Sequence, residues 1–224
     1  MSRPQAFIAS LIAVLAIVGL ATAGAQALAF RANAFPVTLD GTGVKTEPTK
    51  FKFGEVEFTC ESTTLSGTLE KEGPTLLIQR SYAQCLMKFG EGALVPATIK
   101  VNGCAFQLHL ENEIVEDKFG ANVDIACEGA AGIEFFGYNS VASHEAGTPT
   151  CVFEIPPQNG AKTVYLIDMT EEPFDITVQP TVVGLKYKRL KGILCGPETG
   201  TSNYSGNTTM TGTKGGKVVP IWVQ

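Results

Sequence analysis

The chain has 224 residues, of which 44% are hydrophobic and 17% charged, and its formal net charge is -5 at pH 7. This balance is typical of a folded globular protein and excludes a largely disordered one. Proteins that bind nucleic acid concentrate positive charge on one face, so the acidic composition argues against a DNA or RNA partner.

The N-terminal residues predict a secretory signal peptide over residues 1–29. Arg3 precedes an uncharged stretch from Ala6 to Gly24, and small residues in A-x-A arrangements then offer cleavage after Ala27 or Ala29. This order is typical of a signal peptide. The alternative is an uncleaved anchor, because the apolar stretch approaches the roughly 18–20 residues that cross a bilayer. We therefore expect a secreted protein that touches a membrane only if the leader is retained.

Residues 30–224 predict an all-β fold. Short runs of alternating apolar and polar residues are separated by Gly, Pro, Asn and Thr, which is typical of strands and turns. The expected architecture is one Ig-like or related antiparallel β-sandwich, stapled by disulfides. Two small sandwiches divided near residues 156–160 are the alternative. Strands are expected at Thr75–Gln79, Ala121–Cys127, Ile133–Phe136, Cys151–Ile155, Thr163–Asp168, Phe174–Val178, Val182–Lys188, Tyr204–Thr211 and Lys217–Val223.

Two hairpins are predicted in register from their turns. Gly54-Glu55 suits a two-residue turn that pairs Phe53 with Val56 and Phe51 with Phe58 on one face and Lys52 with Glu57 on the other. Asn102-Gly103 suits a turn in which both residues accept positive φ. It is expected to pair Val101 with Cys104, Ile99 with Phe106 and Ala97 with Leu108. In these registers Cys60 and Cys104 share the apolar faces, so their sulfurs are expected to point inward.

The six cysteines are expected to form three disulfides. Their number is even, and export favours oxidation. Zinc sites use closely spaced cysteine pairs, which the chain lacks, so no metal is expected. The expected pairing makes two local closures and one long tie: Cys85–Cys104, Cys127–Cys151 and Cys60–Cys195.

Several cysteine and turn motifs follow one another along the chain. They are Phe58-Thr59-Cys60, the segments 64–67 and 82–85, the segment 97–104 and the C-terminal segment 204–207. In this order they resemble uncharacterised secreted, β-rich, disulfide-containing proteins of actinobacteria. The resemblance implies an exported β-rich fold and brings no activity or catalytic residue with it.

Catalytic constellations are sparse in this sequence. A nucleophile–histidine–acid triad needs an oriented histidine, and neither His109 nor His144 has such partners nearby in the sequence, so both are expected at the surface. Glycosidases use paired carboxylates, and calcium sites use acids at alternating positions. Two acidic groups come closest to these patterns but are expected to be solvated: Glu111, Glu113, Glu116 and Asp117, and Asp168, Glu171, Glu172 and Asp175. No catalytic residue and no cofactor is expected.

Aromatic side chains supply the candidate binding surface. A sugar ring stacks on an exposed aromatic face, and the possible ligand platform consists of Trp222, Tyr204 and Tyr82, with Tyr138 as a further ring. Trp222 follows Pro220, a residue found mainly at sheet edges. The alternative is that these rings belong to the core, where large aromatics are usually found.

The sequence therefore predicts a non-enzymatic, secreted module that binds a partner in the envelope or the medium, or has a structural role there. The sequence leaves the partner unknown, and a glycan and an envelope protein are the candidates. The alternative function is a carbohydrate-binding module or a weakly marked glycoside-active protein.

Overall fold

The structure is a computed structural model that describes residues 28–43, 45–115, 118–161, 163–169 and 176–224. Some predicted features lie outside these described residues. They are the leader up to residue 27, Glu116 and Asp117, and the acidic group at residues 171–175 together with the start of the strand expected at Phe174.

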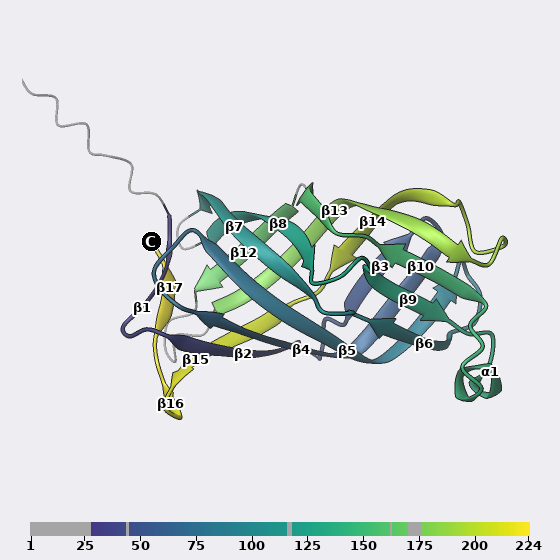
Figure 1. Cartoon of the computed structure of the whole chain (residues 1–224), viewed down its shortest axis with the longest axis horizontal. Coiled ribbons are helices and arrows are strands. Elements are labelled where there is room, and N and C mark those ends of the chain that lie inside the picture. The colour runs from purple at the N-terminus through teal and green to yellow at the C-terminus, as the bar shows by residue number, and fades with distance from the viewer. Residues whose placement is uncertain (1–27, 44, 116–117, 162, 170–175) are drawn as a thin grey trace, which may run out of the picture.

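Antiparallel strands make up most of the described chain, with one short helix (Figure 1). In order the elements are β1 (Phe30–Ala32), β2 (Val37–Gly43), β3 (Thr49–Phe53), β4 (Val56–Leu69), β5 (Thr75–Phe89), β6 (Val95–Lys100), β7 (Cys104–Val115), β8 (Lys118–Cys127), β9 (Ile133–Gly137), α1 (Val141–Glu145), β10 (Cys151–Ile155), β11 (Gln158–Ala161), β12 (Thr163–Met169), β13 (Ile176–Lys191), β14 (Thr199–Ser205), β15 (Thr208–Lys214), β16 (Lys217–Val218) and β17 (Ile221–Val223).

The strand pairings close on themselves in two rings. Ring 1 follows β10, β9, β6, β5, β4, β3, β14 and β13, and β13 then pairs with β10. Ring 2 follows β5, β7, β8, β12, β13, β15, β2 and β4, and β4 then pairs with β5. In Figure 1, ring 1 lies on the right and ring 2 on the left. Opposing layers pack face to face, which confirms the predicted all-β, antiparallel sandwich stapled by disulfides.

Both rings share the three longest strands of the described chain, β4, β5 and β13. Each of these strands changes partner along its length. The first half of β4 pairs with β3 and its second half with β2, while β5 pairs with β7 at one end and with β6 at the other. The place where partners change is called the waist below.

The core differs between the two rings. Ring 1 is filled by fully buried aromatic rings, among which Phe53 stacks on Phe153 with centroids 4.8 Å apart and Phe51 meets Phe135 edge-on at 4.7 Å. Such pairs add about 0.5–1.5 kcal/mol each beyond the area they bury. Ring 2 is filled mainly by aliphatic side chains, including Leu39, Leu65, Ile78, Leu108, Val123, Ile125 and Val178.

The first predicted hairpin is confirmed pair for pair. Phe51 lies opposite Phe58, Lys52 opposite Glu57 and Phe53 opposite Val56. The apolar members are fully buried, because alternate side chains of a strand point to one face. Gly54 has a φ of 62°, as the tight turn requires.

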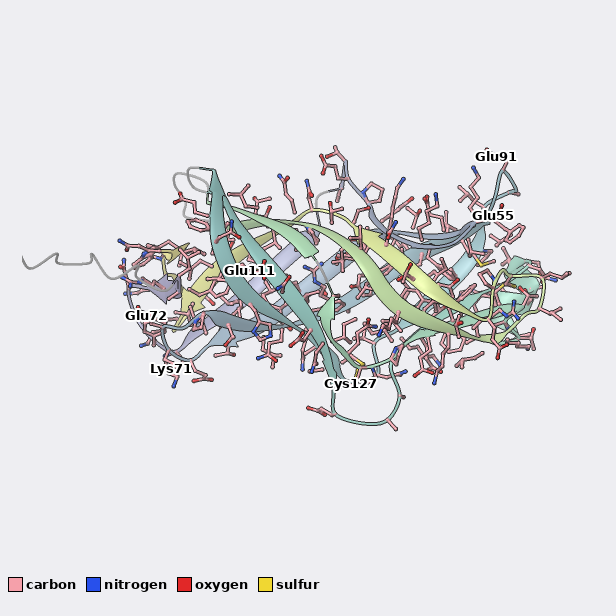
Figure 2. All side chains as sticks on the ribbon, turned by 90° about the horizontal axis from the view of Figure 1, so that it is seen from above. Glu55, Lys71, Glu72, Glu91, Glu111 and Cys127 are labelled. Atoms are coloured by element: carbon pink, nitrogen blue, oxygen red, sulfur yellow. A yellow bond between two sulfur atoms is a disulfide. The ribbon has the colours of Figure 1, made fainter. Side chains whose placement is uncertain are left out.

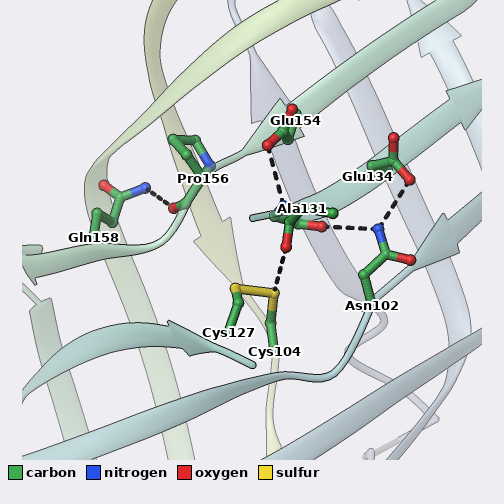
Figure 3. Close-up of a disulfide and its surroundings, with 9 residues drawn as sticks. Asn102, Cys104, Cys127, Ala131, Glu134, Glu154, Pro156 and Gln158 are labelled. Carbon is green, nitrogen blue, oxygen red and sulfur yellow. Dashed lines mark hydrogen bonds between the residues drawn. A yellow bond between two sulfur atoms is a disulfide. The ribbon is translucent and has the colours of Figure 1, made fainter. Parts of the chain in front are cut away.

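The second predicted hairpin is confirmed at its turn and wrong in its pairing. Asn102 and Gly103 have positive φ, and the Cys104 amide donates to the Val101 carbonyl. Beyond the turn, however, β6 pairs with β5 and β9 in ring 1, while β7 pairs with β5 and β8 in ring 2. The Asn102 side chain helps to hold this divergence by donating to the Gly132 carbonyl at 3.0 Å and to the Glu134 carboxylate at 2.9 Å (Figure 3).

Three other strand boundaries differ from the prediction. The strand expected at Tyr204–Thr211 is divided at Gly206, so β14 and β15 join different neighbours. The strand expected at Lys217–Val223 is divided before Pro220, which has no amide proton for a ladder. The two strands expected on either side of residue 180 are one long strand, β13.

All six cysteines form disulfides, but the predicted pairing is wrong. The bridges are Cys60–Cys85, Cys104–Cys127 and Cys151–Cys195. Cys60 lies directly opposite Cys85 in the β4–β5 ladder, and Cys104 lies opposite Cys127 in the β7–β8 ladder. For these two bridges, strand register and not sequence separation therefore selects the partner. Most of the six side chains are buried, as predicted.

We expect replacement of both Cys60 and Cys85 by Ala to lower the free energy of unfolding by about 3 kcal/mol, because the bridge closes a loop in the unfolded chain. Urea unfolding of the variant and the wild type measures this difference. Peptide mapping of the unreduced wild type is the control, and a Cys85–Cys104 fragment would contradict the observed register.

If the predicted leader is removed, we expect the remaining chain to begin at Leu28, which selects Ala27 from the two predicted cleavage positions. The Ala29 amide donates to the Gln224 carbonyl at 2.9 Å, and the Gln224 amide donates back at 3.1 Å. Leu28 also packs on the core. Cleavage after Ala29 would remove these contacts. Intact mass spectrometry of the exported protein tests the start, and a chain beginning at Phe30 or retaining Met1 would contradict it.

Candidate functional site

The predicted aromatic platform does not form a common surface. Tyr204 is 1% exposed and Tyr82 is 9% exposed, so both rings belong to the core. Tyr138 is also buried. Trp222 is half-buried on β17, opposite Arg31 of β1. The prediction that Tyr204 and Tyr82 present their rings to a ligand is therefore wrong, because their inward positions on β14 and β5 place them inside the rings of strands.

Tyr204 takes part in a buried polar cluster at the waist. Its hydroxyl accepts a hydrogen bond from Arg80, whose guanidinium is 5.4 Å from the Tyr204 ring centroid and 5.5 Å from that of Phe106. Nearby in the fold, Thr49 and Thr63 share a hydrogen bond of 2.8 Å. Buried polar groups are costly unless they are bonded. These contacts give the cluster a structural explanation.

The two histidines lie in separate places. His109 Nε2 is 2.9 Å from an Asp124 carboxylate oxygen, and the other oxygen of Asp124 accepts from the Gly160 amide at 2.6 Å. This pair thereby ties β7, β8 and β11 together. His144 of α1 is 3.1 Å from the Thr98 hydroxyl and packs edge-on against Tyr138. Each histidine thus has a local role in holding neighbouring elements.

The acidic group on β7 stays at the surface. Glu111 and Glu113 are exposed, and Glu111 accepts from Asn122 of the adjacent strand. Figure 2 shows Glu111 on the outer side of ring 2. Across the described part of the chain, no three His, Cys, Asp or Glu side chains gather in a way that would hold a metal ion. The described residues also contain no helix long and apolar enough to cross a membrane.

A polar groove lies on the outer face near the waist. Its volume is about 680 Å³, and its lining combines hydroxyl, carboxylate, ammonium and amide groups from Thr42, Glu61, Lys45 and Gln84. A row of hydroxyl residues leads away from it across neighbouring strands, because Thr209, Thr42, Thr64 and Ser81 lie opposite one another in register. The groove presents many hydrogen-bonding groups and no aromatic side chain.

Gln84 gives this groove a further distinguishing feature. Its φ is 53°, and a residue other than glycine in this region costs of order 1–3 kcal/mol and is found preferentially at functional sites. Gln84 lines the groove and also a smaller pocket with Thr98 and His144. The two hollows are therefore neighbours on either side of one strained residue.

A second candidate surface is the loop between β13 and β14. Ile193 and Leu194 at its tip are 83% and 86% exposed, and Leu190 just before it is 48% exposed. We call residues 190–195 the apolar tip. Single exposed apolar residues are ordinary, but two adjacent aliphatic side chains that both project into solvent make this loop a candidate interaction site.

The apolar tip is held in place by several covalent and polar contacts. Cys195 is bonded to Cys151 at the start of β10, and the Cys195 amide donates to the Gly192 carbonyl at 2.8 Å. Arg189 donates to the Ile193 carbonyl at 3.1 Å and to the Gly196 carbonyl. Gly192 has a φ of 94°, and a Cβ there would lie 2.4 Å from the Thr150 carbonyl oxygen. The aliphatic side chains are thus presented on a fixed backbone.

Further apolar residues lie on other loops at this end of ring 1. Phe89 and Leu94 flank the β5–β6 turn, and Val141 begins α1; all three are exposed. In Figure 2, Glu55 and Glu91 of the two neighbouring turns lie together at one end of the molecule, and Lys71 and Glu72 lie at the opposite end. Sequence reasoning missed this end. The available signal was the run Ile193-Leu194 in a Gly-rich turn, where a core residue is not expected.

We expect Tyr204→Ala to destabilise the protein and Trp222→Ala to affect it much less. Removing a buried aromatic side chain costs about 3–5 kcal/mol, and Tyr204 also accepts the Arg80 hydrogen bond. Chemical denaturation of both variants measures the difference. Equal stability of the two variants would contradict the buried position of Tyr204. Because Tyr204→Ala is expected to disturb the core, a loss of ligand binding in this variant would not identify Tyr204 as a surface contact.

The chain matches no protein-family model, and no curated protein or solved structure is similar to it at a significant level. Its function is therefore inferred from the geometry of its own residues.

Proposed function

We propose that the protein is a secreted, non-enzymatic binding module that contacts its partner in the envelope through the apolar tip. The observation that carries this proposal is the exposure of Ile193 and Leu194 on a backbone fixed by the Cys151–Cys195 bridge. Exposed aliphatic surface costs free energy in water, and burying one such side chain regains about 1.5–3 kcal/mol.

Export is supported by the bridges. Three disulfides form among the described residues, and disulfides persist in oxidising compartments outside the cytosol. His109, Asp124 and His144 use their polar atoms to connect neighbouring strands and loops. This structural use of the histidines supports a binding role over a catalytic one.

The second candidate function is carbohydrate binding in the polar groove. The observation that favours it is the hollow lined by Thr42, Glu61 and Lys45 beside the strained Gln84. Hydroxyl-rich ligands exchange hydrogen bonds with such groups, and strained residues recur at ligand sites.

We expect the double variant Ile193→Ser/Leu194→Ser to lose at least about tenfold in retention on sedimented cell envelopes of the producing organism, since two aliphatic side chains no longer leave water on binding. The fraction of purified protein that sediments is the measurement. Val218→Ser is the matched control, because Val218 is 59% exposed on β16 at the opposite end.

Two outcomes would overturn the proposal. Unchanged retention of the double variant would exclude the apolar tip as the contact. Retention that is instead abolished by Glu61→Ala, and displaced by soluble wall polysaccharide, would favour the groove and the carbohydrate function. Circular dichroism of each variant checks that the fold is unchanged.

A further inference from the structure

The charges around the apolar tip indicate its partner. Residues 186–198 contain one acid, Glu198, and four cations: Lys186, Lys188, Arg189 and Lys191. This local excess of positive charge occurs in a chain whose formal net charge is -5. It therefore marks one small region of an otherwise acidic protein.

The cations lie beside the tip in the structure as well as in the sequence. Lys186 and Lys188 are exposed on the outer side of β13, and Lys191 is exposed where the strand ends. Lys188 is 2.9 Å from a carboxylate oxygen of Glu154, whereas Arg189 holds the loop carbonyls. Burial raises the pKa of the neighbouring Tyr187 above its ordinary value, and the positive charge of Arg189 opposes that shift.

The outer face next to β13 continues this positive character. Lys186 lies opposite Thr201 of β14, whose Asn203 lies opposite Lys52 of β3. Lys50, two residues earlier on β3, is 3.6 Å from Glu57. Strands β13 and β3 of ring 1 thus present lysines on either side of the neutral polar residues of β14, with Glu57 of β4 opposite Lys52, and this face ends at the apolar tip.

We infer that the apolar tip inserts into the surface of an anionic lipid layer while the lysines of β13 contact the headgroups. This inference rests on the proposed function and names its partner. It replaces the expectation from the sequence that the protein touches a membrane only if the leader is retained. The tip is a loop with large, exposed aliphatic side chains, and peripheral proteins combine such apolar insertion with attraction between basic residues and anionic headgroups. Protein interfaces rely more on aromatic and Arg anchors in the centre of a larger contact, so a lipid surface fits better.

The arrangement also explains why the tip is fixed. A loop that folded back would hide Ile193 and Leu194 against ring 1, but the Cys151–Cys195 bridge and the bonds from Arg189 hold its backbone outward. A preorganised loop loses less conformational entropy when it inserts. Acids also lie beside the cations: the Arg189 amide donates to the Glu198 carbonyl at 2.6 Å, and Glu154 pairs with Lys188. Lys186 and Lys191 are therefore the lysines of β13 that this inference assigns to the headgroups.

The test uses vesicle sedimentation with the full exported chain. Vesicles of phosphatidylcholine alone are compared with vesicles in which about one-third of the lipid is phosphatidylglycerol. We expect the wild type to sediment with the anionic vesicles, to sediment weakly with the neutral ones, and to be released as added salt screens the charges.

Two variants separate the apolar from the electrostatic part. Ile193→Ser/Leu194→Ser is expected to lower partitioning at least about tenfold on the anionic vesicles. Lys186→Gln/Lys191→Gln is expected to lower it about fivefold for each lysine removed, and to leave the weak binding to neutral vesicles unchanged. The matched control is Lys217→Gln/Val218→Ser, which changes the same kinds of side chain on exposed β16 and should behave as wild type.

A spectroscopic readout checks insertion directly. Leu194→Trp should show a blue shift of tryptophan emission with anionic vesicles, whereas the wild type, whose single tryptophan is Trp222, should show none. Absence of wild-type sedimentation, or equal loss in the control variant, would overturn the lipid inference. If the lipid inference fails but retention on envelopes still depends on Ile193 and Leu194, the proposed binding function stands and its partner is a protein. If retention does not depend on them either, the proposed function and the lipid inference are both wrong.

Discussion

Both rings depend on the register of one ladder, the pairing of β4 with β5. It runs from Val56 opposite Phe89 to Gly67 opposite Ile78, so the same two strands serve ring 1 at one end and ring 2 at the other. Because side chains alternate between faces, a shift by one residue would turn the inward side chains of both strands outward. The Cys60–Cys85 bridge lies within this ladder and admits one register. Closure into rings also leaves few unpaired strand edges, which are sites of aggregation.

The sharing of strands accounts for the polar cluster in the interior. Where β5 changes partner between its pairings with β7 and β6, the chain places Arg80 inside the protein. A buried cation is unfavourable unless other groups compensate for its lost hydration, and the Tyr204 hydroxyl and two aromatic faces contribute to this. Replacing buried ionic groups by apolar ones is often neutral for stability. Arg80 and its hydroxyl and aromatic partners thus lie where the strands divide between the two rings.

Features that depend on residues close together in the sequence were predicted correctly. Features that depend on pairing between distant strands were not. The Gly54-Glu55 hairpin was correct because its turn and its alternation act together over a few residues. The Asn102-Gly103 turn formed as predicted, yet its strands separate, because β5 offers pairing partners to both rings. The predictions of the cysteine pairing and of an exposed Tyr204 were wrong for the same reason, because strand register and the closure of the rings depend on residues far apart in the sequence. The apolar tip was not predicted because the alternation of apolar and polar residues indicates strands and gives no information about which loop side chains are exposed.

The position of the third disulfide distinguishes the tip from an ordinary turn. Cys60–Cys85 and Cys104–Cys127 join residues opposite one another in ladders, where hydrogen bonds already fix the backbone. Cys151–Cys195 instead joins a strand to a loop outside the β13–β14 ladder. Loops are the segments that open most readily, so a bridge there changes local order more than a bridge between paired strands does. This bridge also closes the longest of the three loops in the unfolded chain, with a sequence separation of 44 residues, so it stabilises the fold and at the same time orders the aliphatic side chains that face water.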